Sequence, residues 1–236
     1  MNVFTLEHTP AEIVNTFPKA SDLFKIHDIN FCCQGNRPLH TVLKEKQLEG
    51  EALLEELNQM YETWTAEGHV IIDWETLSLS DIVEHIQDNY HSFLQAELEP
   101  LDQFVSRVYH VHGGDHPHLI DLFSLYHDFI TLAESHLEIE ESQWFPLIKE
   151  FEANPQQELS VQLQEIIQQL ETEHETAVDI LSNMREITNG FQPPAGACNT
   201  YRLTYARLID LEENTLQHVH VENNVLLKRL KEKYGL

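Results

Sequence analysis

The chain has 236 residues, of which 42% are hydrophobic, and its 40 acidic and 14 basic side chains give a formal net charge of −26. Because phosphate binding requires a basic surface, this charge argues against a nucleic-acid partner. No stretch approaches the roughly 20 consecutive apolar residues that a membrane-spanning helix needs, so we expect no membrane insertion. The length allows one large domain, or one domain with a smaller one attached.

The N-terminus has neither the basic start nor the apolar core of a secretory signal peptide, which favours a cytoplasmic location. The three cysteines, Cys32, Cys33 and Cys198, do not form the framework of a disulfide-rich secreted protein. We therefore expect reduced thiols.

Residues 1–65 predict a small helical domain. Pro10 follows Thr9 and suits the first position of a short helix, and Pro18 suits the start of another. The stretch DINFCCQGNRPL then predicts a non-helical turn, followed by a helix-rich stretch that reaches Trp64. Since the segment is short for an independent core, we expect it to dock on another part of the protein. A linker is predicted over residues 66–78.

Residues 79–236 predict a bundle of four long helices. Ser80 is a candidate N-cap for the first helix. The apolar periodicity then predicts helices over about 119–151, 157–187 and 200–233, separated by the turn-forming stretches HVHGGDHPH, ANPQ and NGFQPPAGACN. Short connections between long amphipathic helices predict antiparallel neighbours, so the expected fold is an all-α, antiparallel four-helix bundle preceded by a small helical domain.

Each predicted long helix carries one histidine on its apolar stripe, namely His91, His136, His174 and His218. Two of these histidines are followed four residues later by a glutamate, Glu140 and Glu222. Positions i and i+4 share a face of a helix, so the bundle would direct four imidazoles and two carboxylates towards its centre. By the same spacing, His85 and His220 are expected on solvent-facing sides.

This combination of side chains favours a dinuclear metal site. Two bare carboxylates in a bundle core would repel each other and cost several kcal/mol, and a pair of metal ions removes both problems. Iron accepts imidazole and carboxylate ligands, and a carboxylate can bridge two ions. Hydrogen-bonded core histidines and surface i,i+4 pairs are the alternatives, but one histidine on each of four stripes favours the metal site.

The other histidines and the third cysteine are not assigned to this site. Four of the histidines flank the predicted glycine loop and are expected to be exposed, although a second metal site there is an alternative. They are His110, His112, His116 and His118. Cys198 lies in a proline-rich loop and has no expected role.

Five segments resemble, in this order, the repair-of-iron-centres family of the ScdA/YtfE type, whose members are hemerythrin-like di-iron proteins. The segments are FCCQGNRPL, NYH, SHLEIEESQWFP, ETEH and HVHVENNVL. The resemblance covers nearly the whole chain. It implies a hemerythrin-like bundle preceded by a small ScdA-type domain with a pair of adjacent cysteines. The chain departs from the family at Gln34, where a glycine pair is common, and at Leu227-Lys228, where Phe-Pro is frequent.

The resemblance also implies a ligand set. His91 and His218 would bind one iron ion, and His136 and His174 would bind the other. Glu140 and Glu222 would bridge the two ions, together with an oxo or hydroxo group.

Three further residues receive roles from the resemblance. Glu173 would line an entry path or pass protons. Cys32 and Cys33 would carry out thiol chemistry or bind iron during its transfer, and a purely structural turn is the alternative for the two cysteines. A permanent disulfide between adjacent residues would need a strained ring, so we do not expect one.

The implied function is the repair of iron–sulfur clusters damaged by nitrosative or oxidative stress. Damaged iron–sulfur proteins would be the partners, and nitric oxide or oxygen would be the small ligand. The di-iron site would donate ferrous iron, or it would bind and reduce nitric oxide, in which case the protein is an enzyme. A hemerythrin-like sensor of oxygen, redox state or nitric oxide is the alternative function, and a homodimer is left open.

Overall fold

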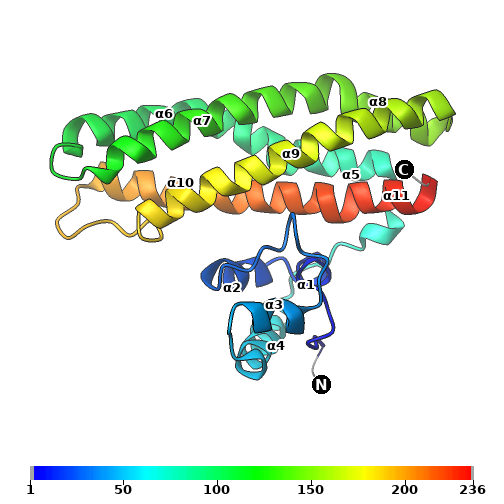
Figure 1. Ribbon diagram of the computed structural model, residues 1–236, viewed down its shortest axis with the longest axis horizontal. Coiled ribbons are helices and arrows are strands. Elements are labelled where there is room, and N and C mark those ends of the chain that lie inside the picture. The colour runs from blue at the N-terminus through cyan, green and yellow to red at the C-terminus, as the bar shows by residue number, and fades with distance from the viewer. Residues whose placement is uncertain (1–2, 235–236) are drawn as a thin grey trace. The chain divides into compact units, whose positions relative to one another are not determined.

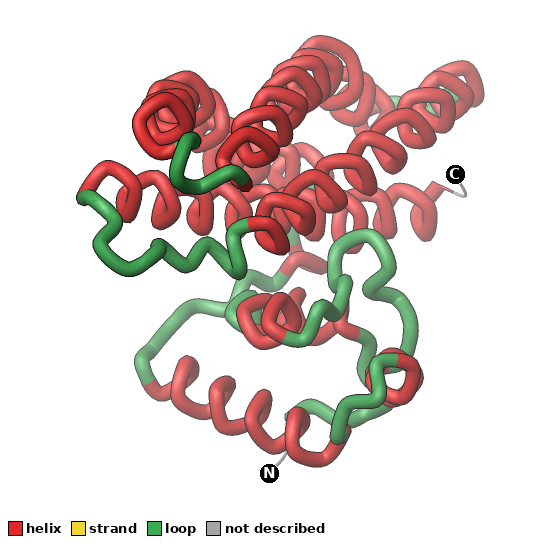
Figure 2. Tube along the Cα trace, turned by 60° about the vertical axis from the view of Figure 1, so that its left-hand side comes forward, coloured by secondary structure: helices red, strands yellow, loops and turns green. Residues whose placement is uncertain are grey.

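The computed structural model describes residues 3–234, and every regular element within them is a helix (Figure 2). This confirms the expected all-α fold. The chain forms two compact units. One unit contains the residues up to Leu77 together with those from Val219 onwards, and the other is Ser78–His218. The division therefore falls inside the last long helix.

The first unit begins with four helices, α1 (Pro10–Thr16), α2 (Ala20–Ile26), α3 (Leu39–Glu45) and α4 (Gly50–Ala66). As predicted, Pro10 opens α1. Thr9 caps this helix reciprocally, because its hydroxyl accepts from Glu12 N at 3.2 Å while the Glu12 carboxylate accepts from Thr9 N at 2.9 Å.

Aromatic rings fill the core of this unit. The ring of Tyr61 in α4 packs edge-on against Phe4 and Phe17, with centroid distances of 5.1 and 5.5 Å. Such contacts stabilise by about 0.5–1.5 kcal/mol beyond the area that they bury. The apolar stretch Val70–Ile72 is not part of this core, because its side chains are exposed to solvent. A short 3₁₀ turn, η1 (Trp74–Thr76), ends the segment.

Four long helices lie alongside one another in the second unit (Figure 1). They are α6 (Ser92–His112), α7 (His118–Ile139), α9 (Gln157–Ile187) and α10 (Asn199–Val221). The structure confirms the predicted four-helix bundle.

We call each continuous run of helical segments in the bundle a rod. In three of the four rods a π-helical turn joins the long helix to a further α-helix. The first rod runs through α5 (Leu79–Ile86) and η2 (Gln87–His91) into α6. The second continues from α7 through η3 (Glu140–Trp144) into α8 (Phe145–Ala153). The last continues from α10 through η4 (Glu222–Leu226) into α11 (Leu227–Tyr234).

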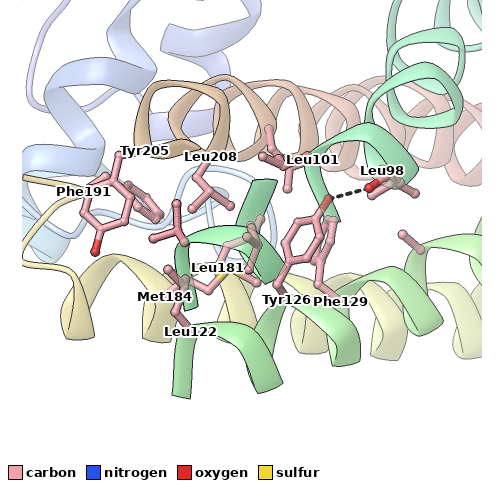
Figure 3. Packing of buried hydrophobic residues seen from close by; sticks show 14 of the residues in the cluster. Leu98, Leu101, Leu122, Tyr126, Phe129, Leu181, Met184, Phe191, Tyr205 and Leu208 are labelled. Carbon is pink, nitrogen blue, oxygen red and sulfur yellow. Dashed lines mark hydrogen bonds between the residues drawn. The ribbon is translucent and has the colours of Figure 1, made fainter. Parts of the chain in front are cut away.

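Apolar side chains from all four long helices pack together in the interior of the bundle (Figure 3). Leu98, Phe129, Leu181 and Leu208, one from each long helix, are buried there. Tyr126 is also buried, and its hydroxyl donates to the Leu98 carbonyl at 2.8 Å. Full burial of one such apolar side chain stabilises the fold by about 1.5–3 kcal/mol.

The first rod begins two residues earlier than predicted. Ser78, and not Ser80, is the N-cap of α5, and it forms a reciprocal capping box with Asp81. Ser80 already lies in the helix, and its hydroxyl donates to a carboxylate oxygen of Glu152 at 2.8 Å. Glu152 also accepts from Ser80 N at 3.0 Å. The first turn of α5 is therefore capped by Ser78 and by the Glu152 carboxylate, and the prediction of Ser80 as the N-cap is wrong.

Among the residues that the structure describes, no helix combines the length and apolar character needed to cross a bilayer.

Candidate metal centre

The four histidines expected to face the core are all buried, with exposed fractions of 1–7%. Their side chains form two pairs. The Nε2 atoms of His91 and His218 lie 3.1 Å apart, and those of His136 and His174 lie 3.2 Å apart. Two imidazole nitrogens bound to one cation at about 2.1 Å lie about 3.0–3.4 Å from each other. Each pair therefore has the spacing of two ligands on a shared ion.

Glu140 lies between the two pairs and is completely buried. Its Oε2 atom is 3.2 Å from Nε2 of both His91 and His136, and 3.7 Å from Nε2 of His218. Neither carboxylate oxygen has a hydrogen bond of normal geometry to any residue that the structure describes. Burial acts to raise the pKa of Glu140, but the imidazoles around it, His136 foremost, hold that pKa well below its usual range. An ionised carboxylate placed in this way suits a cation as its partner.

Glu222 follows His218 by one turn on the same rod and is also completely buried. The structure brings the six predicted ligands into two groups, and within each group the potential ligand atoms lie within 4.8 Å of one another. One group is His91, Glu140, His218 and Glu222, and the other is His136, Glu140, His174 and Glu222. Both glutamates belong to both groups, which is the arrangement that two bridging carboxylates require.

Each π-helical turn of the bundle rods coincides with one of these residues. His91 ends η2, Glu140 begins η3 and Glu222 begins η4. A π turn inserts one extra residue into an α-helix and changes the direction of the side chains on either side of it, and such turns are frequent at functional sites. One extra residue offsets the apolar stripe that follows it by one position, and the periodicity read on either side of each turn did not reveal this offset.

Two carboxylates contact the outward-facing nitrogens of two of the histidines. Glu141 Oε1 lies 2.6 Å from His91 Nδ1, and Glu173 Oε2 lies 2.9 Å from His136 Nδ1. The hydrogen bond with His136 is the main reason why the pKa of Glu173 is lowered. Sequence reasoning singled out Glu173 for an entry path or proton transfer but missed Glu141, which had no signal beyond its position next to a ligand.

Cys32 and Cys33 lie in the loop after α2, in the first unit, and neither forms a disulfide. Their Sγ atoms are 3.8 Å apart. Asn224 Nδ2, from η4 in the same unit, donates to the Cys32 carbonyl at 2.8 Å. The two cysteines are in neither group of candidate ligands.

The expectation that His220 faces solvent is wrong, because its side chain is only 1% exposed. Its Nε2 lies 2.9 Å from Asn15 Oδ1, and its Nδ1 lies 3.3 Å from Asn224 Nδ2. From Val219 onwards the last rod packs within the first unit, so a side of the helix that looked free in the sequence is covered. Burial lowers the pKa of His220 to about 4.

His85 was expected to face solvent, but its side chain is half-buried. Its ring packs against that of Tyr90 at a centroid distance of 5.8 Å, and partial burial lowers its pKa.

The expectation of exposed loop histidines holds for His110 but not for its neighbours. His118 Nε2 lies 3.0 Å from the hydroxyl of Tyr205, and His112 Nε2 lies 3.4 Å from Cys198 Sγ. These side chains do not form a third group of candidate metal ligands within residues 3–234.

Comparison with known proteins agrees with both the fold and the site. The family described as the hemerythrin HHE cation binding domain matches residues 81–230, and ScdA_N, described as a domain of unknown function, matches residues 6–61. The iron-sulfur cluster repair protein ScdA of Staphylococcus haemolyticus (strain JCSC1435) is 34% identical, over 96% of this chain and 99% of that protein. The chain belongs to the ScdA/YtfE family of iron-sulfur cluster repair proteins.

Other members are similar over comparable lengths. ScdA of Staphylococcus epidermidis (strain ATCC 12228 / FDA PCI 1200) is 32% identical over 97% of this chain and all of that protein. YtfE of Enterobacter sp. (strain 638) is 31% identical over 92% of this chain and 94% of that protein. The predicted family and the predicted hemerythrin-like bundle are therefore confirmed. The expected domain limits, at residues 65, 78 and 79, stay predictions.

Proposed function

We propose that the chain binds two iron ions at the centre of its bundle and uses them to repair iron–sulfur clusters damaged by nitrosative or oxidative stress. His91 and His218 hold one ion, and His136 and His174 hold the other. Glu140 and Glu222 bridge them, together with an oxo or hydroxo group. The arrangement of the two imidazole pairs around the buried Glu140 carboxylate carries this proposal. The names of the relatives support the cellular role.

The donor set fits iron. Imidazole nitrogens suit iron, zinc, copper and nickel, whereas carboxylates suit harder ions, so a mixture of four imidazoles and two carboxylates favours an ion that accepts both. When bound, such a pair of ions supplies either redox chemistry on nitric oxide or oxygen, or ferrous iron for a damaged cluster. The chain itself shields the proposed ligands from solvent: five of the six are at most 2% exposed, and His136 is 7% exposed.

Cys32 and Cys33 have a proposed part in the same function. Their adjacent thiols, held by the backbone contacts of the loop, would take up iron transiently or carry out thiol chemistry during repair. Replacing both by serine should leave the iron content of the bundle unchanged and slow cluster repair. Unchanged repair rates would leave the two cysteines with a structural role only.

The proposal is tested by loading the purified protein anaerobically with ferrous iron and measuring its iron content and Mössbauer spectrum. About two irons per chain with coupled high-spin signals are expected, whereas less than one iron per chain after reconstitution would contradict the metal site. The loaded protein is then mixed with a nitric-oxide-treated iron–sulfur protein, and cluster absorption is followed. Recovery with loss of iron from the chain supports donation, and nitrous oxide in the headspace supports reduction of nitric oxide. If neither is observed, the repair role fails although the metal site stands.

A further inference from the structure

Two triads of side chains, each containing a glutamine, a glutamate and a histidine, flank the metal centre. In the first, Gln87 Nε2 donates to Glu141 Oε2 at 2.5 Å, and the other oxygen of Glu141 lies 2.6 Å from His91 Nδ1. We call Gln87 and Glu141 the first clamp. The glutamine and the histidine lie on one rod, in η2, and the glutamate reaches them from η3 of the next rod.

The second triad repeats the chemistry on another pair of helices. Gln169 Nε2 donates to Glu173 Oε1 at 2.8 Å, and Glu173 Oε2 lies 2.9 Å from His136 Nδ1. We call Gln169 and Glu173 the second clamp. Here the glutamine and the glutamate both lie on α9, and the histidine comes from α7. The two clamps are therefore built from differently arranged helices. What they have in common is a carboxylate that contacts Nδ1 of a histidine at the metal centre.

Each clamp acts on a ring nitrogen that faces away from the centre. A neutral imidazole carries one N–H group and one lone pair. If Nδ1 of His91 donates to Glu141, the lone pair is on Nε2, and Nε2 is the atom that lies 3.1 Å from His218 Nε2 and 3.2 Å from Glu140. The same reasoning applies to His136, whose Nε2 faces His174 and Glu140. Each clamp thus selects the tautomer that can bind a cation.

The two glutamines fix the orientation of the glutamate carboxylates. A carboxylate that contacts a histidine through one oxygen can still rotate about its own side chain. Because the second oxygen of Glu141 and of Glu173 accepts from a glutamine, both ends of each carboxylate are fixed. Groups that fix the orientation of a metal-bound imidazole typically change metal affinity by about 10–100-fold when they are removed.

The two histidines that carry clamps belong to different groups of candidate ligands. We propose that the first clamp positions the ligand of one cation and the second clamp positions the ligand of the other, so that the affinity for each cation is set by its own glutamate. Glu141 and Glu173 are positioning residues in this assignment and do not themselves contact the cations. The inference rests on the proposed binding of two cations at this centre, and it adds that the two can be weakened independently.

Anaerobic titration with ferrous iron against a competing chelator, together with Mössbauer spectra, tests the assignment on the full chain. His91→Ala and His136→Ala first identify which binding step and which spectral component belong to which position. Glu141→Ala should then weaken the step lost in His91→Ala by about 10–100-fold and leave the other step unchanged. Glu173→Ala should do the reverse, and Gln87→Ala should weaken the same step as Glu141→Ala by a smaller factor.

Glu138→Ala is the matched control, because Glu138 is exposed and lies on the same rod as Glu141. It should leave both steps unchanged. Thermal unfolding of the iron-free variants separates positioning from a merely structural tie between helices.

Unchanged binding in Glu141→Ala and Glu173→Ala would overturn the proposal. Equal weakening of both steps, accompanied by a loss of stability in the iron-free protein, would also overturn it and make the clamps structural ties. If the unaltered chain binds no iron, the proposed function fails with the clamps. If it binds two irons and the variants behave as the unaltered chain does, only the clamps fail.

Discussion

His174 tests the proposed ligand set at the level of a single residue. It is 1% exposed, and its Nε2 lies 3.2 Å from that of His136. Replacing it by alanine removes one of two imidazoles from a single cation position. We expect His174→Ala to hold at most about half of the iron of the unaltered chain and to lose the absorption that arises from the coupled pair. Iron analysis and visible spectroscopy measure both.

His110 is the appropriate control for this variant, because its side chain is exposed. His110→Ala should retain the iron and the absorption. The structure rules out His220 for this purpose, since His220 is buried and hydrogen-bonded, and its loss would perturb the fold of the first unit. Equal loss of iron in His174→Ala and His110→Ala would mean that the inward-facing histidines are not the ligands.

The buried imidazole of His220 predicts a loss of stability in acid. Burial lowers its pKa to about 4, whereas in the unfolded chain it is about 6.5. Between these values only the unfolded chain takes up the proton, so stability falls as the pH falls from about 6.5 to about 4. The full effect is about 3 kcal/mol. In iron-free protein, denaturant unfolding should show that the unaltered chain loses about this much more stability than His220→Gln over that interval.

Parallel losses in the two proteins would contradict this prediction. Other carboxylates and histidines also titrate over the interval, and for this reason the difference between the two proteins is the quantity that tests His220.

At the residue scale, spacing alone was enough to predict that the six proposed ligands are buried and lie close together. A side chain placed on an apolar stripe every three or four residues must face the core, so polar residues on the stripe stood out. Glu141 and Gln87 could not be predicted in this way, because each has its partner on a neighbouring rod. Only the packing of the helices brings such groups together.

Ser78 provides a test at the scale of the helix. It caps α5 through a hydrogen bond from Asp81 N to its hydroxyl, at 3.0 Å. Ser78→Ala should lower the free energy of unfolding by about 1 kcal/mol, because an orphan backbone N–H group of the first turn loses its acceptor. Ser182, exposed in α9 and far from the N-terminus of that helix, is the control, and Ser182→Ala should change stability by less than about 0.5 kcal/mol. Denaturant unfolding measures both. A fall in the free energy of unfolding in Ser182→Ala but not in Ser78→Ala would refute the assigned cap.

The long helices could be predicted because their apolar stripes repeat over many turns and because loops rich in glycine, proline and asparagine separate them. Their fine structure could not. Ser78 and Ser80 both stand near the start of the first rod, and only the structure shows that Ser78 caps the helix while Ser80 N–H donates to Glu152. The residues of the π turns η2, η3 and η4 carry no local signal that distinguishes a π turn from an α turn.

At the scale of the whole molecule, the first unit depends on a piece of chain that is distant in sequence. Residues from Val219 onwards belong to it, and Asn224 and Arg229 contact backbone carbonyls of the first 77 residues. A fragment of residues 1–77 should therefore fail to fold cooperatively, since so short a chain buries little apolar surface and here lacks part of its core. Circular dichroism during thermal unfolding should show a broad transition for the fragment.

A sharp unfolding transition in the fragment would contradict this expectation. The full-length chain is the comparison, and we expect its transition to be sharper.

The docking of the N-terminal segment was predicted from its shortness, but its partner within the chain was not. Nothing in the pattern of the last helix distinguishes residues that follow the bundle from residues that join the other unit. His220 shows the difficulty, because it lies two residues after a predicted ligand and was assigned to solvent by spacing alone. Contact with a distant segment overrides the periodicity at such positions.

The π turns carry a consequence for how this protein varies among relatives. Each π turn is a helical turn with one inserted residue, and we expect it to be retained only where His91, Glu140 and Glu222 serve the same metal centre. Relatives that no longer bind metal at this centre can lose the inserted residue. Alignments should then reveal single-residue gaps at these three places in bundles that lack the histidines, and unbroken columns in those that keep them.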